Sequence, residues 1–509
     1  MKNRGDASRI ARTMKPRTLL SAALLVLLSG CATFKTEPSP DPESLSCYRF
    51  LEKMDRLVAL SGVADAGAAR IAGFPQLRTT RFLASFATDQ PEGDAYRFWR
   101  DALRRTDAQA RQIELRNLPS RQRLELQADA PGAAPAERAV AVCGAKLAAA
   151  DLASPQRRNL LLERAVAPDS YFGWQRAVGV YPVTRLVFAQ AVERLHRELR
   201  QSFALPPDKL PVAGKVLRYQ PPKDSLLSAP EVADILAKGS RNPLRIPEPS
   251  PPVLEWLFQQ FAPIFEVDTR DADDRIGAIR LRPSGEVQVD AATPVVYRLP
   301  SHTRFRGRTL LQLNYLVWFP ARPPTGAVDI YAGRFDGLIW RVTLVPGGEP
   351  LVYDSIHPCG CYYQVFPTPG FHVVQPQDGS EPIFSPQTIG PFEPDARLVI
   401  RLAHGTHFIQ KIYADQPTGG AVAYSWQDYD ALRSLPASDG MRHSLFDPDG
   451  LVPGSGRPER FLFWPMGVPS AGAMRQMGTH AIAFLGRRHF DDARLLDGLL
   501  SSADSGFGE

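Results

Sequence analysis

The sequence predicts an α+β protein with a mostly helical first half, a Pro-rich linker and a mostly antiparallel, β-rich second half. Three observations support this prediction. Residues 47–204 are rich in Ala, Leu and Arg, and their apolar residues recur at helical spacing. Residues 205–252 contain eleven prolines, and residues 253–509 contain short alternating segments bounded by Gly and Pro, which is typical of strands and turns.

The chain begins with an export pattern. Lys15 and Arg17 precede an apolar run over residues 19–27, which is followed by Leu28-Ser29-Gly30-Cys31. This run is shorter than the roughly 20 residues that span a bilayer, and small residues precede the cysteine. The pattern resembles the lipobox of bacterial lipoproteins, in which the bond before the cysteine is cut. The resemblance implies a signal peptide over residues 1–30 and a diacylglyceryl thioether and acylated amine on Cys31, which anchor the protein to a membrane.

The same resemblance implies a location. In lipoproteins an Asp directly after the lipidated cysteine favours the inner membrane, and this chain has Ala32 there. We therefore expect the protein at the periplasmic face of the outer membrane of a Gram-negative-type envelope. Residues 31–46, with Pro38, Pro40 and Pro42, are predicted to form an extended tether between the lipid and the helical region.

The net charge excludes one class of partner. The formal net charge is +6, but residues 1–30 carry six basic residues and one acidic residue, so they account for +5 of it. The mature chain is close to neutral, and we expect no nucleic-acid partner. A lipid-anchored protein in the envelope is expected to contact the membrane and an envelope protein or a glycan.

Helix signals follow in order along the first half. Ser154-Pro155 is typical of an N-cap followed by Pro at the first helical position. In the Pro-rich segment, Ser228 and Glu231 form a capping-box pattern ahead of a short helix. Between these two predicted helices, the sequence predicts an amphipathic helix over 183–203, with Arg194, Arg197 and Arg200 on its solvated side. Its apolar face consists of Val183, Leu186, Val187, Val192, Leu195 and Leu199.

Strand signals dominate the second half. Residues 278–290 form a predicted hairpin that turns at Pro283-Ser284-Gly285, and residues 338–353 form another that turns at Pro346-Gly347-Gly348. Residues 309–319 and 397–402 are further predicted strands, and a short helix is expected near 492–499. Tyr315, Trp318 and Phe319 either shape a groove for a glycan or peptide or are ordinary strand residues. Asp268, Asp271, Asp273 and Asp274 are predicted to be a solvated acidic loop.

Export makes disulfides plausible for the four cysteines other than Cys31. Cys47 and Cys143 lie in the helical half and are predicted to pair. Cys359 and Cys361 occur in His357-Pro358-Cys359-Gly360-Cys361, for which three alternatives remain open. They are a strained, redox-active disulfide, a soft site for Zn or Cu, and a structural turn.

Eight of the nine histidines lie in the second half, which adds weight to a site there. Gly405, between His404 and His407, could mark a bulge that directs both imidazoles into one cavity. The candidate metal ligands are therefore His357, Cys359, Cys361, His404 and His407. Met466, Met474, Met477 and His480 are either copper ligands or, for the methionines, core filling.

Two functions agree with these patterns. The first is a non-catalytic envelope lipoprotein that binds a partner or ligand through its β-rich half. The second is a periplasmic metal-binding or thiol-dependent enzyme that uses the His-x-Cys-x-Cys cluster. The sequence has no His-Glu-x-x-His, Gly-x-Ser-x-Gly or P-loop motif. We favour the first function because each chemical motif also has a structural explanation.

Overall fold

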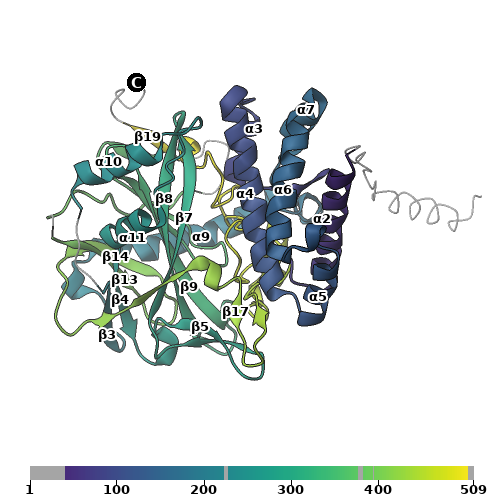
Figure 1. Cartoon of the computed structure of the whole chain (residues 1–509). Coiled ribbons are helices and arrows are strands. Elements are labelled where there is room, and N and C mark those ends of the chain that lie inside the picture. Colours follow the sequence, from purple (N-terminus) through teal and green to yellow (C-terminus); the bar gives the residue numbers. More distant parts are fainter. Residues whose placement is uncertain (1–40, 223–226, 376–381, 394, 503–509) are drawn as a thin grey trace, which may run out of the picture. The chain divides into compact units, whose positions relative to one another are not determined.

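Helices dominate the first half of the chain and strands the second, which confirms the α+β class (Figure 1). The computed structural model describes residues 41–222, 227–375, 382–393 and 395–502, all of which belong to one unit, Ser39–Glu509. Cys31, the predicted signal peptide and the tether up to residue 40 lie outside the described residues. None of the helices in this part of the chain combines the length with the apolar composition that crossing a lipid bilayer requires.

The helices are α2 (Pro42–Leu60), α3 (Arg81–Ala87), α4 (Gly93–Asn117), α5 (Ser120–Ala128), α6 (Ala136–Leu152), α7 (Pro155–Arg164), α8 (Gly173–Val178), α9 (Tyr181–Ala204), α10 (Ala229–Gly239), α11 (Pro251–Gln260) and α12 (Glu459–Phe463). Two of these helices begin at the predicted capping residues. Ser154 accepts a hydrogen bond from the Arg157 amide at the start of α7, and the Ser228 amide donates to Glu231 ahead of α10. Both predicted caps are confirmed.

The first helix begins earlier than expected. Asp41 caps α2 by accepting a hydrogen bond from the Ser44 amide, and Pro42 occupies the first turn. Residues 42–46, which we assigned to the tether, are therefore helical. The prolines that suggested an extended tether also fit a capped helix start.

The strands are β1 (Ala69–Ile71), β2 (Phe74–Thr79), β3 (Lys215–Gln220), β4 (Ile264–Thr269), β5 (Ala278–Leu281), β6 (Val287–Asp290), β7 (Val295–Phe305), β8 (Arg308–Arg322), β9 (Gly333–Leu344), β10 (Pro350–Ile356), β11 (Gln364–Pro367), β12 (Phe371–Val373), β13 (Arg397–Leu402), β14 (Ile409–Asp415), β15 (Val422–Ala423), β16 (Ser425–Asp428), β17 (Leu435–Pro436), β18 (Arg442–His443) and β19 (Leu500–Ser502). Both predicted hairpins are confirmed, as β5–β6 and β9–β10.

Two larger sheets organise the second half. One has the order β11-β10-β9-β8-β7-β16 and the other β14-β13-β4-β3-β15. Most neighbouring strands are antiparallel, while β4–β13, β3–β15 and β7–β16 pair in parallel. Alternate residues of β8 enter two different cores, because successive side chains of a strand point to opposite faces. Val317 and Phe319 pack in the core shared with the second sheet, whereas Trp318 packs in a core shared with the C-terminal segment.

Both faces of β8 are therefore covered, which favours the second alternative for its aromatic residues, ordinary strand residues. Tyr315, Trp318 and Phe319 are fully buried, so they form no open groove.

The Pro-rich segment also differs from a simple linker. It contributes β3 to the middle of a sheet, and Ile246 packs in a core with α3 and α4. The short helix predicted near 492–499 is present only as a single 3-10 turn, Leu496–Gly498.

The helical half has its own cores. Cys47 of α2 and Cys143 of α6 form a disulfide, the pairing that the cysteine count predicts, and both residues lie among the apolar side chains of α2 and α6. The disulfide closes a long stretch of chain, since the two residues are 96 positions apart. Such a bridge stabilises the fold mainly by restricting the unfolded chain.

A buried charge network forms at one end of the helical half. Arg78 of β2 donates to Asp107 and Glu114 of α4 over 3.1 and 2.7 Å. Arg111 of the same helix donates to Asp107 over 2.8 Å and to Asp55 of α2 over 2.7 Å. Every charge in this group except Asp55 is nearly inaccessible to solvent. The network therefore ties α2, α4 and β2 together through ion pairs that water does not screen.

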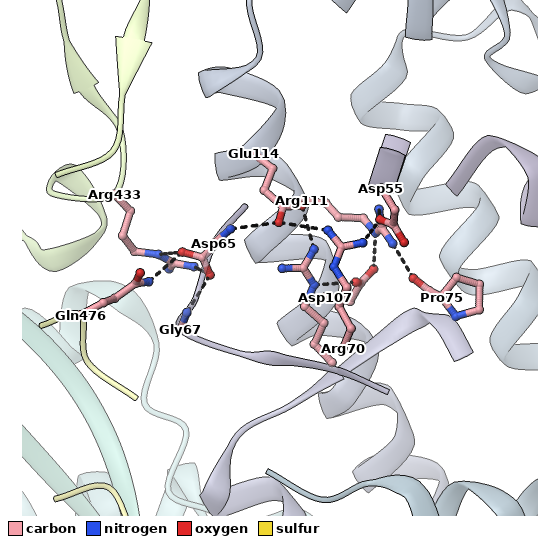
Figure 2. Close-up of polar contacts among 11 residues, drawn as sticks. Asp55, Asp65, Gly67, Arg70, Pro75, Asp107, Arg111, Glu114, Arg433 and Gln476 are labelled. Carbon is pink, nitrogen blue, oxygen red and sulfur yellow. Dashed lines mark hydrogen bonds and ion pairs between the residues drawn. The ribbon is translucent and has the colours of Figure 1, made fainter. Parts of the chain in front are cut away.

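The network continues into the second half of the chain (Figure 2). The amide of Asp65 donates to Glu114, while the Asp65 carboxylate accepts hydrogen bonds from Arg433 and Gln476 at 2.7 to 2.8 Å. Burial would raise the pKa of Asp65, but Arg433 lowers it below its usual value. Asp65 is thus an ionised link between the helical residues and the segment after β16.

Candidate functional site

A pocket with a volume of about 250 Å³ lies beside α9. Its wall is mostly apolar and aromatic, which is typical of small-molecule sites. The apolar lining comes from α9, from the end of α12 and from three loop segments, and its larger members are Phe188, Leu195, Leu199, Phe384, Phe408, Phe463 and Phe484. His196, the one histidine of the helical half, stacks on Phe384, and burial lowers its pKa to about 4. It is neutral at pH 7.

Arg322, at the end of β8, provides a positive charge in this apolar wall. Its Nη1 donates to the Tyr362 hydroxyl over 3.2 Å, and its guanidinium lies 5.1–5.8 Å from the ring centres of Tyr331, Tyr362 and Phe408. The side chain is buried, yet Nε has no hydrogen-bond partner. No carboxylate among the described residues lies within ion-pair distance of Arg322. The guanidinium therefore keeps unused donors inside the pocket.

Glu459, the first residue of α12, contributes the opposite charge. It is 2% exposed, and its carboxyl group has no hydrogen-bond or ion-pair partner within the described part of the chain. Burial raises its pKa to about 7, because the charges of Arg457 and Arg322 offset the loss of hydration only in part. Gly472 permits this position: it has a φ of +84°, and a Cβ there would overlap the Glu459 carboxyl group.

A second group of charges lies next to the pocket, centred on Asp336 of β9. His407 Nδ1 lies 2.9 Å from one carboxylate oxygen of Asp336, and His357 Nδ1 lies 3.2 Å from the other. Arg457 Nη2 is 3.5 Å from Asp336, and His407 Nε2 is 3.4 Å from Asp274. His407 also stacks on Phe319 with parallel rings at 3.9 Å. All of these charged side chains are buried.

Their protonation follows from these contacts. Burial would raise the pKa of Asp336, but the hydrogen bonds from His357 and His407 and the charge of Arg457 hold it well below its usual range. Burial would also lower the pKa of His407, yet its contacts with Asp274 and Asp336 raise it. Burial dominates at His357, whose pKa is lowered. The contacts therefore favour the ionised form of Asp336, the protonated form of His407 and the neutral form of His357.

The backbone around the pocket is strained. Phe335, Tyr362, His407 and Phe484 have φ between +52° and +61°, a region that non-glycine residues seldom adopt. Phe335 precedes Asp336, and Tyr362 and Phe484 line the pocket. Strained conformations of this kind cluster at binding and active sites, where the surrounding structure holds them.

The predicted His-x-Cys-x-Cys cluster lies at this site. Cys359 and Cys361 are buried free thiols, not a disulfide, and Cys361 lines the pocket. The His357 amide donates to the Cys361 carbonyl over 3.0 Å and closes a turn at Gly360. Gly360 has a φ of +86°, and a Cβ there would overlap the Ala481 carbonyl. The hydrogen bond between the thiols, together with burial, raises the pKa of Cys361 well above its usual value. At Cys359 the same hydrogen bond lowers the pKa, and burial opposes this shift.

The other predicted residues have different roles. His404 is half-buried and makes no contact with Asp336, so only His407 of that pair joins the group. Met466 and Met474 fill the core, as the alternative for the methionines predicts. In the described part of the chain, no three His, Cys, Asp or Glu side chains are arranged to hold a metal ion.

Sequence reasoning missed three residues of the site and misjudged a fourth. Asp274 was assigned to a solvated loop, but it is buried: its carboxylate accepts hydrogen bonds from the amides of Gly405 and Arg270, and its pKa falls to about 2. Asp268, which belongs to the same predicted loop, is also buried. Its carboxylate accepts hydrogen bonds from the Ala213 and Gly214 amides. Asp336 carried a usable signal, since it is the one acidic residue within the otherwise apolar stretch Phe335–Trp340. For Arg322 and Glu459 the sequence holds no comparable signal.

Comparisons of the chain with protein-family models, curated protein sequences and solved structures found no significant match. The fold and the pocket define the class: an α+β protein with a small, mostly apolar pocket whose lining includes two buried, oppositely charged side chains, Arg322 and Glu459.

Proposed function

We propose that this protein is a lipid-anchored protein at the periplasmic face of the outer membrane that binds a small amphiphilic ligand. The ligand has an apolar body and an anionic head group such as a carboxylate. The aromatic wall of the pocket contacts the apolar body, and Arg322 binds the head group. The lipobox resemblance supports the location, and the pocket supports binding.

One observation carries the proposal: Arg322 is buried in an apolar wall without an ion-pair partner among the described residues. A buried charge without a partner is costly, and a guanidinium pairs well with a carboxylate. Glu459 lies in the same wall and is about half protonated at pH 7. Its protonated form can donate a hydrogen bond to the same head group.

Arg322→Gln is expected to weaken decanoate binding by about 10- to 100-fold, because a charge-assisted hydrogen bond contributes roughly 1.5–3 kcal/mol. Binding of decanol, which has no charge, is expected to change little. The measurement is isothermal titration calorimetry on a chain that starts at Ala32, which keeps all of Ser39–Glu509.

The matched control is Arg197→Gln, because Arg197 is an exposed arginine of α9 outside the pocket lining. Circular dichroism of each variant checks that it is folded. Absence of decanoate binding to the parent chain would contradict the proposal, as would equal decanoate affinity in the parent and Arg322→Gln.

Decanoate affinity is expected to fall by about tenfold between pH 6 and pH 8. Glu459 titrates near pH 7, and its ionised form repels an anionic head group. The carboxyl group of decanoate is ionised throughout this range, and His196 is neutral throughout it. Calorimetry at four pH values measures the slope. Glu459→Gln should flatten it, and an unchanged slope in that variant would rule out Glu459 as its origin.

A further inference from the structure

Large apolar side chains are exposed on three elements beside the pocket. They belong to α8 and the residue before it, to the first turns of α9, and to α12, and each is 45–70% exposed. We call this set the apolar surface: Phe172, Trp174, Val178, Val180, Val183, Leu186, Phe461 and Leu462. Val183 and Leu186 begin the apolar face of α9 that the sequence predicts, yet only the later part of that face packs against the protein. Exposed apolar groups of this size mark interaction surfaces.

The three elements are neighbours although α12 is distant in the sequence. The Phe172 amide donates to the Gly467 carbonyl over 2.7 Å, and Arg176 Nη1 donates to the Met466 carbonyl over 3.0 Å. The rings of Phe188 in α9 and Phe463 in α12 lie 5.2 Å apart. These contacts join the elements of the apolar surface into one region.

The junction between α8 and α9 is strained as well. Val180 has a φ of +47° and is 55% exposed. A β-branched residue in this conformation is a genuine outlier, and an exposed valine gains no packing there. Strained backbone of this kind clusters at binding sites.

Charge distinguishes among partners. Residues 172–186 contain Arg176 and Arg185 and no Asp or Glu, and around α12 the exposed Arg460 accompanies the buried Glu459. On residues 172–186 and around α12, the apolar surface is therefore accompanied by arginines and has no exposed acidic residue. Apolar and aromatic residues next to arginines are typical of segments that insert into the interface of an anionic bilayer.

The apolar surface adjoins the pocket. Phe188 and Phe463, from two of its three elements, line the pocket wall. If Cys31 carries a lipid, the ten residues from Ala32 to Asp41 can span at most about 35 Å, so the described unit stays close to the membrane. A surface that rests on lipid would place the pocket beside the source of an amphiphilic ligand.

We propose that the apolar surface docks onto a bilayer containing anionic phospholipid and that the ligand enters the pocket from this bilayer. The proposal rests on the proposed function for the location of the protein and for the class of ligand. The docked segments are α8, the first turns of α9 and α12.

Vesicle flotation tests the docking with the chain that starts at Ala32, which carries no lipid anchor. We expect at least tenfold stronger partitioning onto vesicles of phosphatidylcholine with 25% phosphatidylglycerol than onto pure phosphatidylcholine. Trp174→Ser combined with Phe461→Ser should reduce partitioning onto the anionic vesicles by about tenfold or more, because both side chains lose apolar contact with lipid. The matched control is Leu124→Ser combined with Val328→Ser, which removes exposed apolar residues on other segments.

Equal partitioning of the parent and the Trp174→Ser, Phe461→Ser variant would overturn the docking proposal. A second copy of the chain is the competing occupant, and sedimentation velocity detects it: a dimer that this variant abolishes would also overturn the proposal. Decanoate titration without vesicles reports on the pocket separately. Normal decanoate binding without vesicle binding refutes the surface alone, and vesicle binding without decanoate binding refutes the pocket alone.

Discussion

Glu114→Gln is expected to lower the free energy of unfolding by about 3–5 kcal/mol at pH 7. The Glu114 carboxylate accepts hydrogen bonds from Arg78 at 2.7 Å and from the Asp65 amide at 3.1 Å. A glutamine cannot neutralise Arg78, which is fully buried, and its amide nitrogen places a donor against another donor. Urea unfolding followed by circular dichroism measures the change.

Asp94→Asn is the control for this prediction. Asp94 pairs with Arg97 within α4, the helix that holds Glu114, but both side chains are mostly exposed. Exposed pairs contribute about 0–1 kcal/mol, so this variant should unfold nearly like the parent. Similar small changes in both variants would show that the network in Figure 2 does not hold α4, β2 and the Asp65 link together.

Local patterns in the sequence were sufficient to predict the fold class and most of the elements that define it. The alternation in residues 278–290 and 338–353 gave both hairpins, and the caps at Ser154 and Ser228 gave two helix starts. The errors have a common cause, which is tertiary packing. β3 lies in a segment whose proline content suggested a linker, and its place between β4 and β15 depends on partners far along the chain.

The site was predicted only in part, for a related reason. The clustering of His357, Cys359 and Cys361 was visible because these residues are close in the sequence. Asp336 joins His357 to His407 through pairing that the sequence does not display, and Glu459 reaches the pocket from a five-residue helix. The role of Asp336 as a partner of two histidines and the raised pKa of Glu459 both depend on burial in the folded protein. The spacing of residues in the sequence does not show which side chains are buried.

Asp336→Asn is expected to destabilise the protein by about 3–5 kcal/mol at pH 6, because it removes the carboxylate that faces His357, His407 and Arg457 in a buried site. The pH dependence follows from the pKa directions. The pKa of Asp336 is depressed, so its stabilisation is present above the unfolded value near 4 and is lost as the pH falls through the folded pKa. The pKa of His407 is raised, so its stabilisation is complete below about 6.5 and is lost as the pH rises through the folded pKa. The difference between the parent and the variant should therefore be largest from about pH 4 to pH 6.5.

Two measurements separate this electrostatic role from simple loss of packing. Urea unfolding at pH 5, 6 and 8 gives the stability difference, and NMR titration of the histidine rings gives the pKa of His407, which should fall in Asp336→Asn because only Asp274 remains beside it. Asp428→Asn is the control, since Asp428 is a mostly exposed aspartate paired with Arg298. A stability loss that does not vary with pH, together with an unchanged His407 pKa, would show that Asp336 acts by shape alone. A pH-dependent loss together with a lowered His407 pKa would instead mean that the charge of Asp336 favours the protonated form of His407 in the buried group next to the proposed head-group site.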